Sequence, residues 1–230
     1  MIGLDLRDAE VVADLGTLAG RLAAVASVEA SVHRLDAVVC CAGVDVRDPL
    51  TVRVNYFGVV DVLTGLQPLL ARGSDPRAVV VASMAAIHPA ADAGVIVACL
   101  DGDEERAVAA AAQALAADPP RSVYAASKRA LCRWVRRQAP TPDWAGAGIP
   151  LNAVAPGIVR TPMVEHRLAD DRRRARLEED VPMPLHGPAE PEHVAALLAW
   201  LDGPENVLVT GQIVFADGGA DVVLRGDEAW

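Results

Sequence analysis

Ala78-Val79-Val80-Val81-Ala82-Ser83 is an apolar run dominated by valine, and it ends on a hydroxyl group. A run of this length and composition predicts a strand buried on both faces, as in parallel sheets that helices cover on each side. Residues 35–41 form a second such run, which ends at Ala42-Gly43, and residues 149–155 and 212–215 provide two more. Buried strands of this kind indicate an α/β protein.

Helical patterns separate these strands. They cover residues 17–33, 52–71, 101–117, 122–139, 160–180 and 191–201. Two further short strands, residues 2–5 and 11–14, open the chain, and each ends in a carboxylate. Strands that alternate with helices predict a doubly wound, Rossmann-like parallel sheet. We expect residues 1–230 to form one domain of this class.

Composition narrows the partners. Hydrophobic residues make up 52% of the 230 and aromatics only 3%, while the formal net charge is -10 and the pI about 4.9. An acidic surface repels phosphate backbones and anionic lipids, so nucleic acid and membranes are not expected partners. No apolar stretch approaches the roughly 18 residues of a spanning helix, and the first five residues do not form a secretion signal. We therefore expect a cytoplasmic protein.

Cysteine and histidine provide no pattern for a metal. The four cysteines lack C-x-x-C spacing, and the five histidines lack H-x-H or H-E-x-x-H spacing. Cys40 and Cys41 are adjacent and would point to opposite faces of a strand. We expect reduced, buried thiols and no catalytic metal.

The stretch Tyr124-Ala125-Ala126-Ser127-Lys128 carries chemistry. On a helix, residues four apart share a face, so Tyr124 and Lys128 project together. A free phenol has a pKa of about 10, and a nearby ammonium favours the phenolate and lowers that pKa. Ser83, at the carboxyl end of its strand, can hydrogen-bond the same carbonyl oxygen, because ligands of open α/β sheets bind at that edge. The three side chains predict an acid–base site for a carbonyl.

These features, with others in the same order, resemble the classical short-chain dehydrogenase/reductases over essentially the whole chain. The further matching motifs are Asn55 in Val54-Asn55-Tyr56-Phe57-Gly58, Cys41-Ala42-Gly43 in place of the usual Asn-Ala-Gly, Pro156-Gly157 with Thr161-Pro162, and Asp217-Gly218-Gly219. The resemblance implies an oxidoreductase that interconverts a secondary alcohol and a ketone with a nicotinamide cofactor.

The resemblance also implies residue roles. Tyr124 would be the acid and base, Ser83 would orient the oxygen, and Asn55 would hold a helix kink and a proton-relay water. Lys128 would contact the nicotinamide ribose, Thr161 the carboxamide, Asp5 the adenine ribose and Asp14 the adenine. The other expected cofactor contacts are Leu15, Cys41, Ala42, Gly43, Pro156, Gly157 and Val159. A carboxylate at Asp5 repels a 2′-phosphate, so NAD is favoured over NADP.

The spacing points to a subgroup. Ser83 and Tyr124 lie 41 positions apart, where the family usually has about a dozen, and the insertion at about 88–120 holds an alanine-rich helix. This insertion and the opening residues 2–15 resemble the bacterial 3α-hydroxysteroid dehydrogenase/carbonyl reductase subgroup. The insertion is either an interface element or a surface helix without a role. The family implies a homodimer or homotetramer, and an apolar carbonyl or alcohol as the small-molecule substrate.

The start of the chain departs from the family. There, a first strand and a glycine-rich turn precede the position of Asp5 and bind the pyrophosphate. The sequence lacks this segment, so we expect an N-terminally truncated domain without the usual first strand and helix, and with two unpaired strand edges. Two explanations stay open. Met1 is a misassigned start, or the chain is naturally short and fills the gap by rearrangement or with another subunit.

Two other functions therefore stay open beside the oxidoreductase. One is a catalytically silent scaffold or assembly subunit that binds no cofactor, and the other is an epimerase or dehydratase that uses the same tyrosine. For the oxidoreductase we expect an apolar substrate wall, formed by Met84, Ile87, Met163, Leu168 and Met183.

Overall fold

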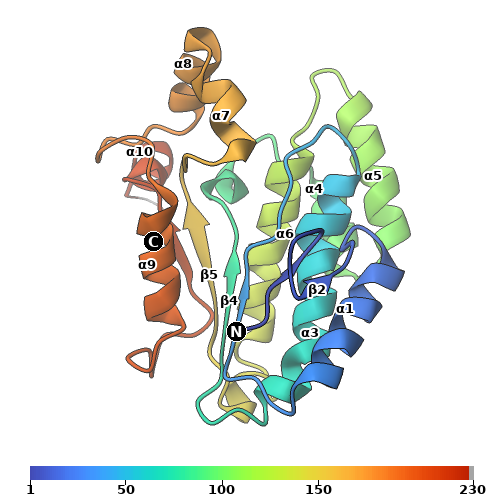
Figure 1. Cartoon of the computed structure of the whole chain (residues 1–230). Helices are drawn as coiled ribbons and strands as arrows, with labels where there is room; N and C mark the ends of the chain where they lie inside the picture. Colours follow the sequence, from blue (N-terminus) through green and yellow to red (C-terminus); the bar gives the residue numbers. More distant parts are fainter. Residues whose placement is uncertain (228–230) are drawn as a thin grey trace.

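The computed structural model describes residues 1–227, and its centre is a four-stranded parallel sheet. The strands β3 (Ala37–Cys40), β4 (Arg77–Val81), β5 (Leu151–Pro156) and β6 (Ile213–Ala216) pair in the order β3-β4-β5-β6. Because all four run in the same direction, their carboxyl ends meet at one edge, which is the upper edge in Figure 1. The predicted α/β class is confirmed.

Two short strands form a sheet of their own. β1 (Leu4–Asp5) and β2 (Val11–Val12) pair in parallel with each other and with no strand of the larger sheet. Among residues 1–227, no strand pairs with the outer edge of β3. Val39 on β3 is 42% exposed, although its neighbour Val79 on β4 is fully buried. The division into two sheets agrees with the expected pair of unpaired edges.

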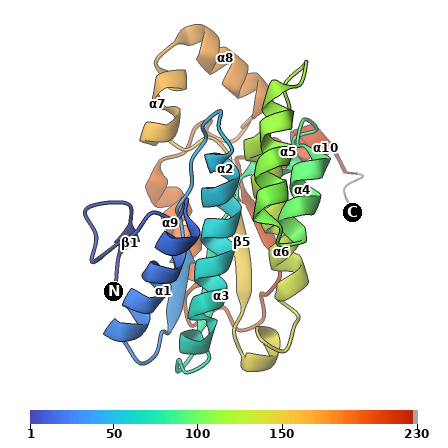
Figure 2. The same cartoon turned by 90° about the vertical axis from the view of Figure 1, so that its right-hand side faces the viewer.

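Helices cover both faces of the larger sheet. α1 (Leu18–Ser31), α3 (Val59–Leu70) and α6 (Val123–Gln138) lie on one side, and α9 (Pro191–Leu201) lies on the other (Figures 1 and 2). Alternate strand residues separate two cores, because Ala78 and Val80 pack toward α3 and α6 while Val79 packs with Leu201 of α9. The sheet is doubly wound, as predicted.

The helix predicted over residues 52–71 is continuous in space but irregular. It begins as α2 (Leu50–Val52), continues as the π-helix η1 (Arg53–Gly58) and becomes regular in α3. Insertion of a π-helical turn rotates the residues on either side relative to a regular helix. Asn55 lies in this turn and is fully buried.

The insertion contains two helices where the sequence predicted one. α4 (Ala93–Leu100) was missed because its residues are apolar nearly all round, without amphipathic spacing. Asp92 caps α4, and Asp103 caps α5 (Glu104–Ala116), each by accepting a hydrogen bond from a backbone N–H two or three residues into its helix. Both helices pack beside α6 (Figure 2). The insertion is an integral layer of the fold.

A buried charge cluster ties this layer to the rest of the protein. Arg21 of α1 is 1% exposed, lies 2.9 Å from the carboxylate of Asp61 and pairs with Glu104 of α5. Glu104 also accepts a hydrogen bond of 3.1 Å from Arg53. Removing one partner from such a cluster leaves an uncompensated buried charge, so the contact fixes where α5 lies.

The remaining elements follow the strands' carboxyl ends. The predicted helical segment 160–180 is two helices, α7 (Pro162–Leu168) and α8 (Asp171–Asp180), which project beyond the sheet (Figure 1). Short helices not predicted from the sequence are η2 (Met84–Ile87), η3 (Ala145–Ala147) and α10 (Ala220–Arg225). Within residues 1–227, no helix has the length and apolar character to cross a membrane.

Candidate active site

Tyr124 and Lys128 project from the first two turns of α6. The hydroxyl of Ser122 caps the helix by accepting a hydrogen bond of 3.1 Å from the N–H of Ala125, which fixes where the helix begins. Tyr124 is the second residue of the helix and Lys128 follows one turn later. The Lys128 Nζ lies 5.9 Å from the centre of the Tyr124 ring. The structure thus brings the predicted pair together.

Ser83 lies directly beyond the carboxyl end of β4 and caps η2. Its Oγ accepts a hydrogen bond of 3.1 Å from the N–H of Ala85, and the Ser83 side chain lies beside the phenol of Tyr124 on the wall of the same cavity. Arg129, the residue after Lys128, holds this segment through hydrogen bonds to the carbonyls of Ala86 and His88. The strand end and the helix start therefore meet in one fixed arrangement.

Lys128 is the only lysine of the 230 residues, and it is 3% exposed. Its Nζ donates a hydrogen bond of 2.8 Å to the carbonyl of Val81, the last residue of β4. Burial lowers the pKa of Lys128 to about 8, an effect that Cys132 and Cys41 oppose. The ammonium is therefore mostly protonated at neutral pH and loses its charge in the mildly alkaline range.

The pKa of Tyr124 differs from the sequence-based expectation. Burial raises it above the ordinary value, and the hydrogen bond with Ser83 lowers it in part. Asp45 raises the pKa of Tyr124 and Arg167 lowers it. The predicted net lowering of the Tyr124 pKa was wrong for this structure, because burial of the phenol is the largest effect and outweighs the effects that lower the pKa.

Asn55 links the π-helix to the loop after β3. Its Oδ1 accepts a hydrogen bond of 2.8 Å from the N–H of Val44, and its Nδ2 donates to the carbonyl of Val44 at 2.9 Å. The same Nδ2 donates to the hydroxyl of Ser127 at 3.2 Å. The side chain thereby connects the end of β3 to α6, and the irregular turn agrees with the expected kink.

Gly43 lies between Asn55 and Lys128. A Cβ at this position would stand 3.3 Å from Asn55 Oδ1 and 3.4 Å from Lys128 Nζ, closer than most Cβ contacts. Cys41 and Ala42, just before it, are exposed at the carboxyl edge of the sheet. At residues 41–43 the backbone is therefore accessible at the carboxyl edge of the sheet, beside the buried ammonium of Lys128.

The other expected cofactor residues lie at the strand ends of the two separate sheets. Asp5 is exposed at the end of β1, and its Oδ1 accepts a hydrogen bond from the N–H of Leu6 at 2.6 Å. Asp14 follows β2 and accepts a hydrogen bond from Gly16 at 2.9 Å, while Leu15 is partly buried beside it. Pro156 ends β5, and Gly157, Val159 and Thr161 follow it at the carboxyl edge of the larger sheet.

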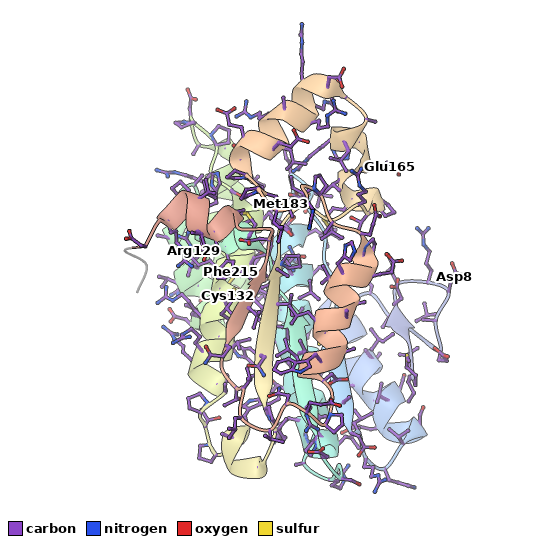
Figure 3. The ribbon with its side chains drawn as sticks, turned by 90° about the vertical axis from the view of Figure 1, so that its left-hand side faces the viewer. Asp8, Arg129, Cys132, Glu165, Met183 and Phe215 are labelled. Carbon is purple, nitrogen blue, oxygen red and sulfur yellow. The ribbon has the colours of Figure 1, made fainter. Side chains whose placement is uncertain are left out.

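A cavity of about 550 Å³ opens in front of Ser83 and Tyr124. Met84 and Met163 line it, as predicted for the substrate wall. Ile87, Leu168 and Met183 are not among the residues that line it. Met183 instead accepts a hydrogen bond from the N–H of Ile158 at 3.1 Å and packs against Gly157, near the end of β5 (Figure 3).

The cavity wall is more polar than the sequence indicated. The charged residues that line it are Asp45, Arg47, Arg121, Arg167, Arg176 and Asp180. None was assigned from the sequence, and no local motif marks them, because they come from the loop after β3, the segment before α6 and the helices α7 and α8. Arg129, which holds η2, was missed for the same reason.

The thiols differ in their surroundings. Cys99 and Cys132 are buried, as expected, but Cys41 is exposed and Cys40 is half-buried. The expectation of four buried thiols was wrong because β3 ends at Cys40 and its outer edge is uncovered among the described residues. Residues 1–227 contain no group of three or more histidine, cysteine or carboxylate side chains placed to hold a metal.

Comparison with known proteins gives a family for this arrangement. The chain is 37% identical over 229 residues to the 3-alpha-hydroxysteroid dehydrogenase/carbonyl reductase of Comamonas testosteroni, an alignment that covers 98% of this chain and 88% of that protein. The chain belongs to the short-chain dehydrogenase/reductase family. A family model described as enoyl-(acyl carrier protein) reductase also matches residues 106–221.

Two further relatives agree with membership in the short-chain dehydrogenase/reductase family. The crystal structure of the 3-alpha-hydroxysteroid dehydrogenase from Pseudomonas sp. B-0831 complexed with NADH is 42% identical, with a TM-score of 0.89, and covers 98% of this chain and 89% of that chain. An oxidoreductase of Salmonella typhimurium is 29% identical over 225 residues, or 91% of this chain and 74% of that protein. The resemblance found from the sequence motifs is confirmed.

Proposed function

We propose that the protein is an NAD(P)-dependent oxidoreductase that interconverts a secondary alcohol and a ketone. The observation that carries the proposal is the contact of Ser83 with Tyr124 on the wall of one cavity, with the buried amine of Lys128 one turn behind. The similarity to two hydroxysteroid dehydrogenases supports a hydroxysteroid or another apolar carbonyl compound as the substrate.

In ketone reduction, Tyr124 donates its proton to the substrate oxygen, and in alcohol oxidation it accepts that proton. Ser83 hydrogen-bonds the same oxygen and holds it against the phenol. The charge of Lys128 favours the phenolate that forms when Tyr124 gives up its proton. The Asn55 side chain hydrogen-bonds both the loop after β3 and the hydroxyl of Ser127 on α6, and so fixes that loop relative to α6. As the resemblance to the family implies, Asn55 also supports the proton relay.

A bound nicotinamide supplies or accepts the hydride. The residues present fit a nicotinamide dinucleotide at its nicotinamide end and at its adenosine end. Beside Lys128, Gly43 leaves room for a close backbone approach, and the exposed carboxylate of Asp5 suits ribose hydroxyls better than a phosphate. We infer that NAD(H) is preferred to NADP(H). The further contacts come from Asp14, Leu15, Cys41, Ala42, Pro156, Gly157, Val159 and Thr161.

A second candidate function rests on the separation of the two sheets. The outer edge of β3 is unpaired, and residues 1–227 contain no glycine-rich strand–turn–helix to hold a pyrophosphate. Several lost phosphate contacts weaken binding by orders of magnitude, since each 1.4 kcal/mol is tenfold. A catalytically silent scaffold or assembly subunit would keep the same fold without the cofactor.

The wider setting is proposed with the activity. We infer one domain over residues 1–230, a homodimer or homotetramer, and a cytoplasmic location. The support is the shared length with relatives of this family and, for the location, the strongly acidic composition with no helix fit to span a membrane among the described residues.

Calorimetric titration of the 230-residue chain with NADH and NADPH separates the two candidate functions. We expect NADH to bind with a Kd of about 10–100 μM and NADPH about tenfold more weakly, because Asp5 repels the 2′-phosphate. Asp5→Asn should narrow this difference. Asp8→Asn, in the exposed turn between β1 and β2 (Figure 3), is the matched control and should leave it unchanged. No binding of either nucleotide up to millimolar concentration would favour the silent scaffold.

A further inference from the structure

One ion pair lies on the wall of the cavity. Arg167 of α7 donates a hydrogen bond of 2.7 Å to the carboxylate of Asp45, which lies in the loop after β3. Among the ion pairs of residues 1–227, it is the one that joins the helices α7 and α8 to the rest of the protein. The two residues are 122 positions apart in the sequence, so the contact exists only in the folded chain.

The pair is less exposed to solvent than an ordinary surface ion pair. The side chains are 38% and 25% exposed, which leaves much of each charge away from water. Both residues line the cavity that Ser83 and Tyr124 also line. Exposed pairs contribute little, but partial burial strengthens the interaction of each charge with its neighbours.

The two charges act on Tyr124 in opposite directions. Asp45 raises the pKa of the phenol, and Arg167 lowers it. Their effects on Tyr124 therefore oppose each other. Without the charge of Arg167, the carboxylate of Asp45 would favour the protonated form of the phenol.

We propose that Asp45 and Arg167 are a positioning pair for the reaction: their ion pair holds α7 and α8 against the loop after β3, on the wall of the cavity that Tyr124 also lines. The proposal rests on the proposed function, because it concerns the same acid and base. In the folded chain the phenol experiences both charges, and removal of either charge leaves the other to act on it alone.

Other charged groups lie on or beside the same cavity, and they are the same in the wild type and in every variant of Asp45 and Arg167. Lys128 and Arg129 come from α6, and Arg121 from the segment before it. The loops after β3 and η2 contribute Arg47 and His88, and α8 contributes Arg176 and Asp180. Their charges move the absolute pKa of Tyr124. They do not produce opposite shifts when Asp45 and Arg167 are replaced in turn.

The test compares Asp45→Asn, Arg167→Gln and the double variant. The pH midpoint of kcat/KM for alcohol oxidation should fall by about half a pH unit in Asp45→Asn and rise by a similar amount in Arg167→Gln. The double variant should return close to the wild-type midpoint. We also expect each single variant to lose about tenfold in kcat/KM, with the double variant no worse than the singles, because the two residues act as one unit.

Arg174→Gln is the matched control. Arg174 pairs with Asp171 at 2.8 Å within α8 and does not line the cavity, so its loss removes the same charge from the same pair of helices. It should leave the pH midpoint unchanged. Midpoints that do not move in Asp45→Asn and Arg167→Gln, or that move in the same direction, would overturn the proposal.

A second readout does not need turnover. The chain has two tyrosines, and Tyr56 is almost fully buried, so the ultraviolet absorbance of tyrosinate, taken as wild type minus Tyr124→Phe, follows Tyr124 alone. The same opposite shifts are expected in this titration. If no variant turns over substrate but the absorbance midpoints shift as stated, the pairing is supported and the proposed function fails. Turnover without these shifts contradicts the pairing and leaves the proposed function standing.

Discussion

Tyr124→Phe is expected to lower kcat for ketone reduction by about a thousandfold. The phenol lies on the cavity wall beside Ser83, and its replacement removes the proton donor while keeping the ring. General acid catalysis contributes roughly 10²–10⁴-fold, which sets the size of the loss. The measurement is the steady-state rate of ketone-dependent NADH oxidation at saturating ketone.

Tyr56→Phe is the control for loss of a phenolic hydroxyl. Tyr56 is 2% exposed, lies in the π-helix and packs edge-on against Phe57, outside the cavity lining. It should retain kcat within about threefold and lose at most a modest amount of stability. Wild-type turnover in Tyr124→Phe, with unchanged folding by circular dichroism, would refute Tyr124 as the acid.

Lys128→Met is expected to lower kcat/KM by about a hundredfold without lowering the melting temperature. The substitution removes the charge that favours the phenolate. It also replaces a buried amine by an apolar side chain, whose burial has no cost of desolvating a charge. Lys128→Arg should not restore activity, because a planar guanidinium cannot occupy the space of the ammonium between Gly43 and Val81.

The pKa of Lys128 can be measured directly, because the chain has no other lysine. Its folded pKa of about 8 lies below the ordinary value, so the unfolded chain binds more protons at alkaline pH. The contribution of Lys128 to the free energy of unfolding should therefore rise with pH above about 8. Over the same range the ammonium loses its charge, and its contribution to catalysis is lost. A pKa near 10 from the methylated amine in a nuclear magnetic resonance titration would contradict the assigned burial.

Much of the fold could be predicted from the sequence because it depends on local pattern. Valine-rich runs gave the buried strands, and helical spacing gave α1, α3, α6 and α9 near their observed ends. Tyr124, Lys128 and Ser83 could be paired because a helix face and a strand end place side chains predictably. Prediction worked where one element, or the edge of one sheet, determined the position.

The misses have a common physical cause, which is dependence on contacts between distant segments. α4 has no amphipathic pattern, because its exposed face includes apolar residues such as Val97 and the face that packs against α5 and α6 is apolar too. Asp45 and Arg167 form a pair only when α7 folds over the loop after β3. The direction of the pKa of Tyr124 depends on burial, which sequence spacing does not report.

The most direct test of the account is NADH consumption by the purified 230-residue protein with a 3-oxosteroid, combined with identification of the product. If Tyr124, Ser83 and Lys128 act as assigned, the corresponding secondary alcohol forms in a one-to-one ratio with the NADH consumed, and the reverse reaction runs with NAD at higher pH. Absence of the alcohol and of NADH consumption, from a folded protein that binds NADH, would contradict the central claim.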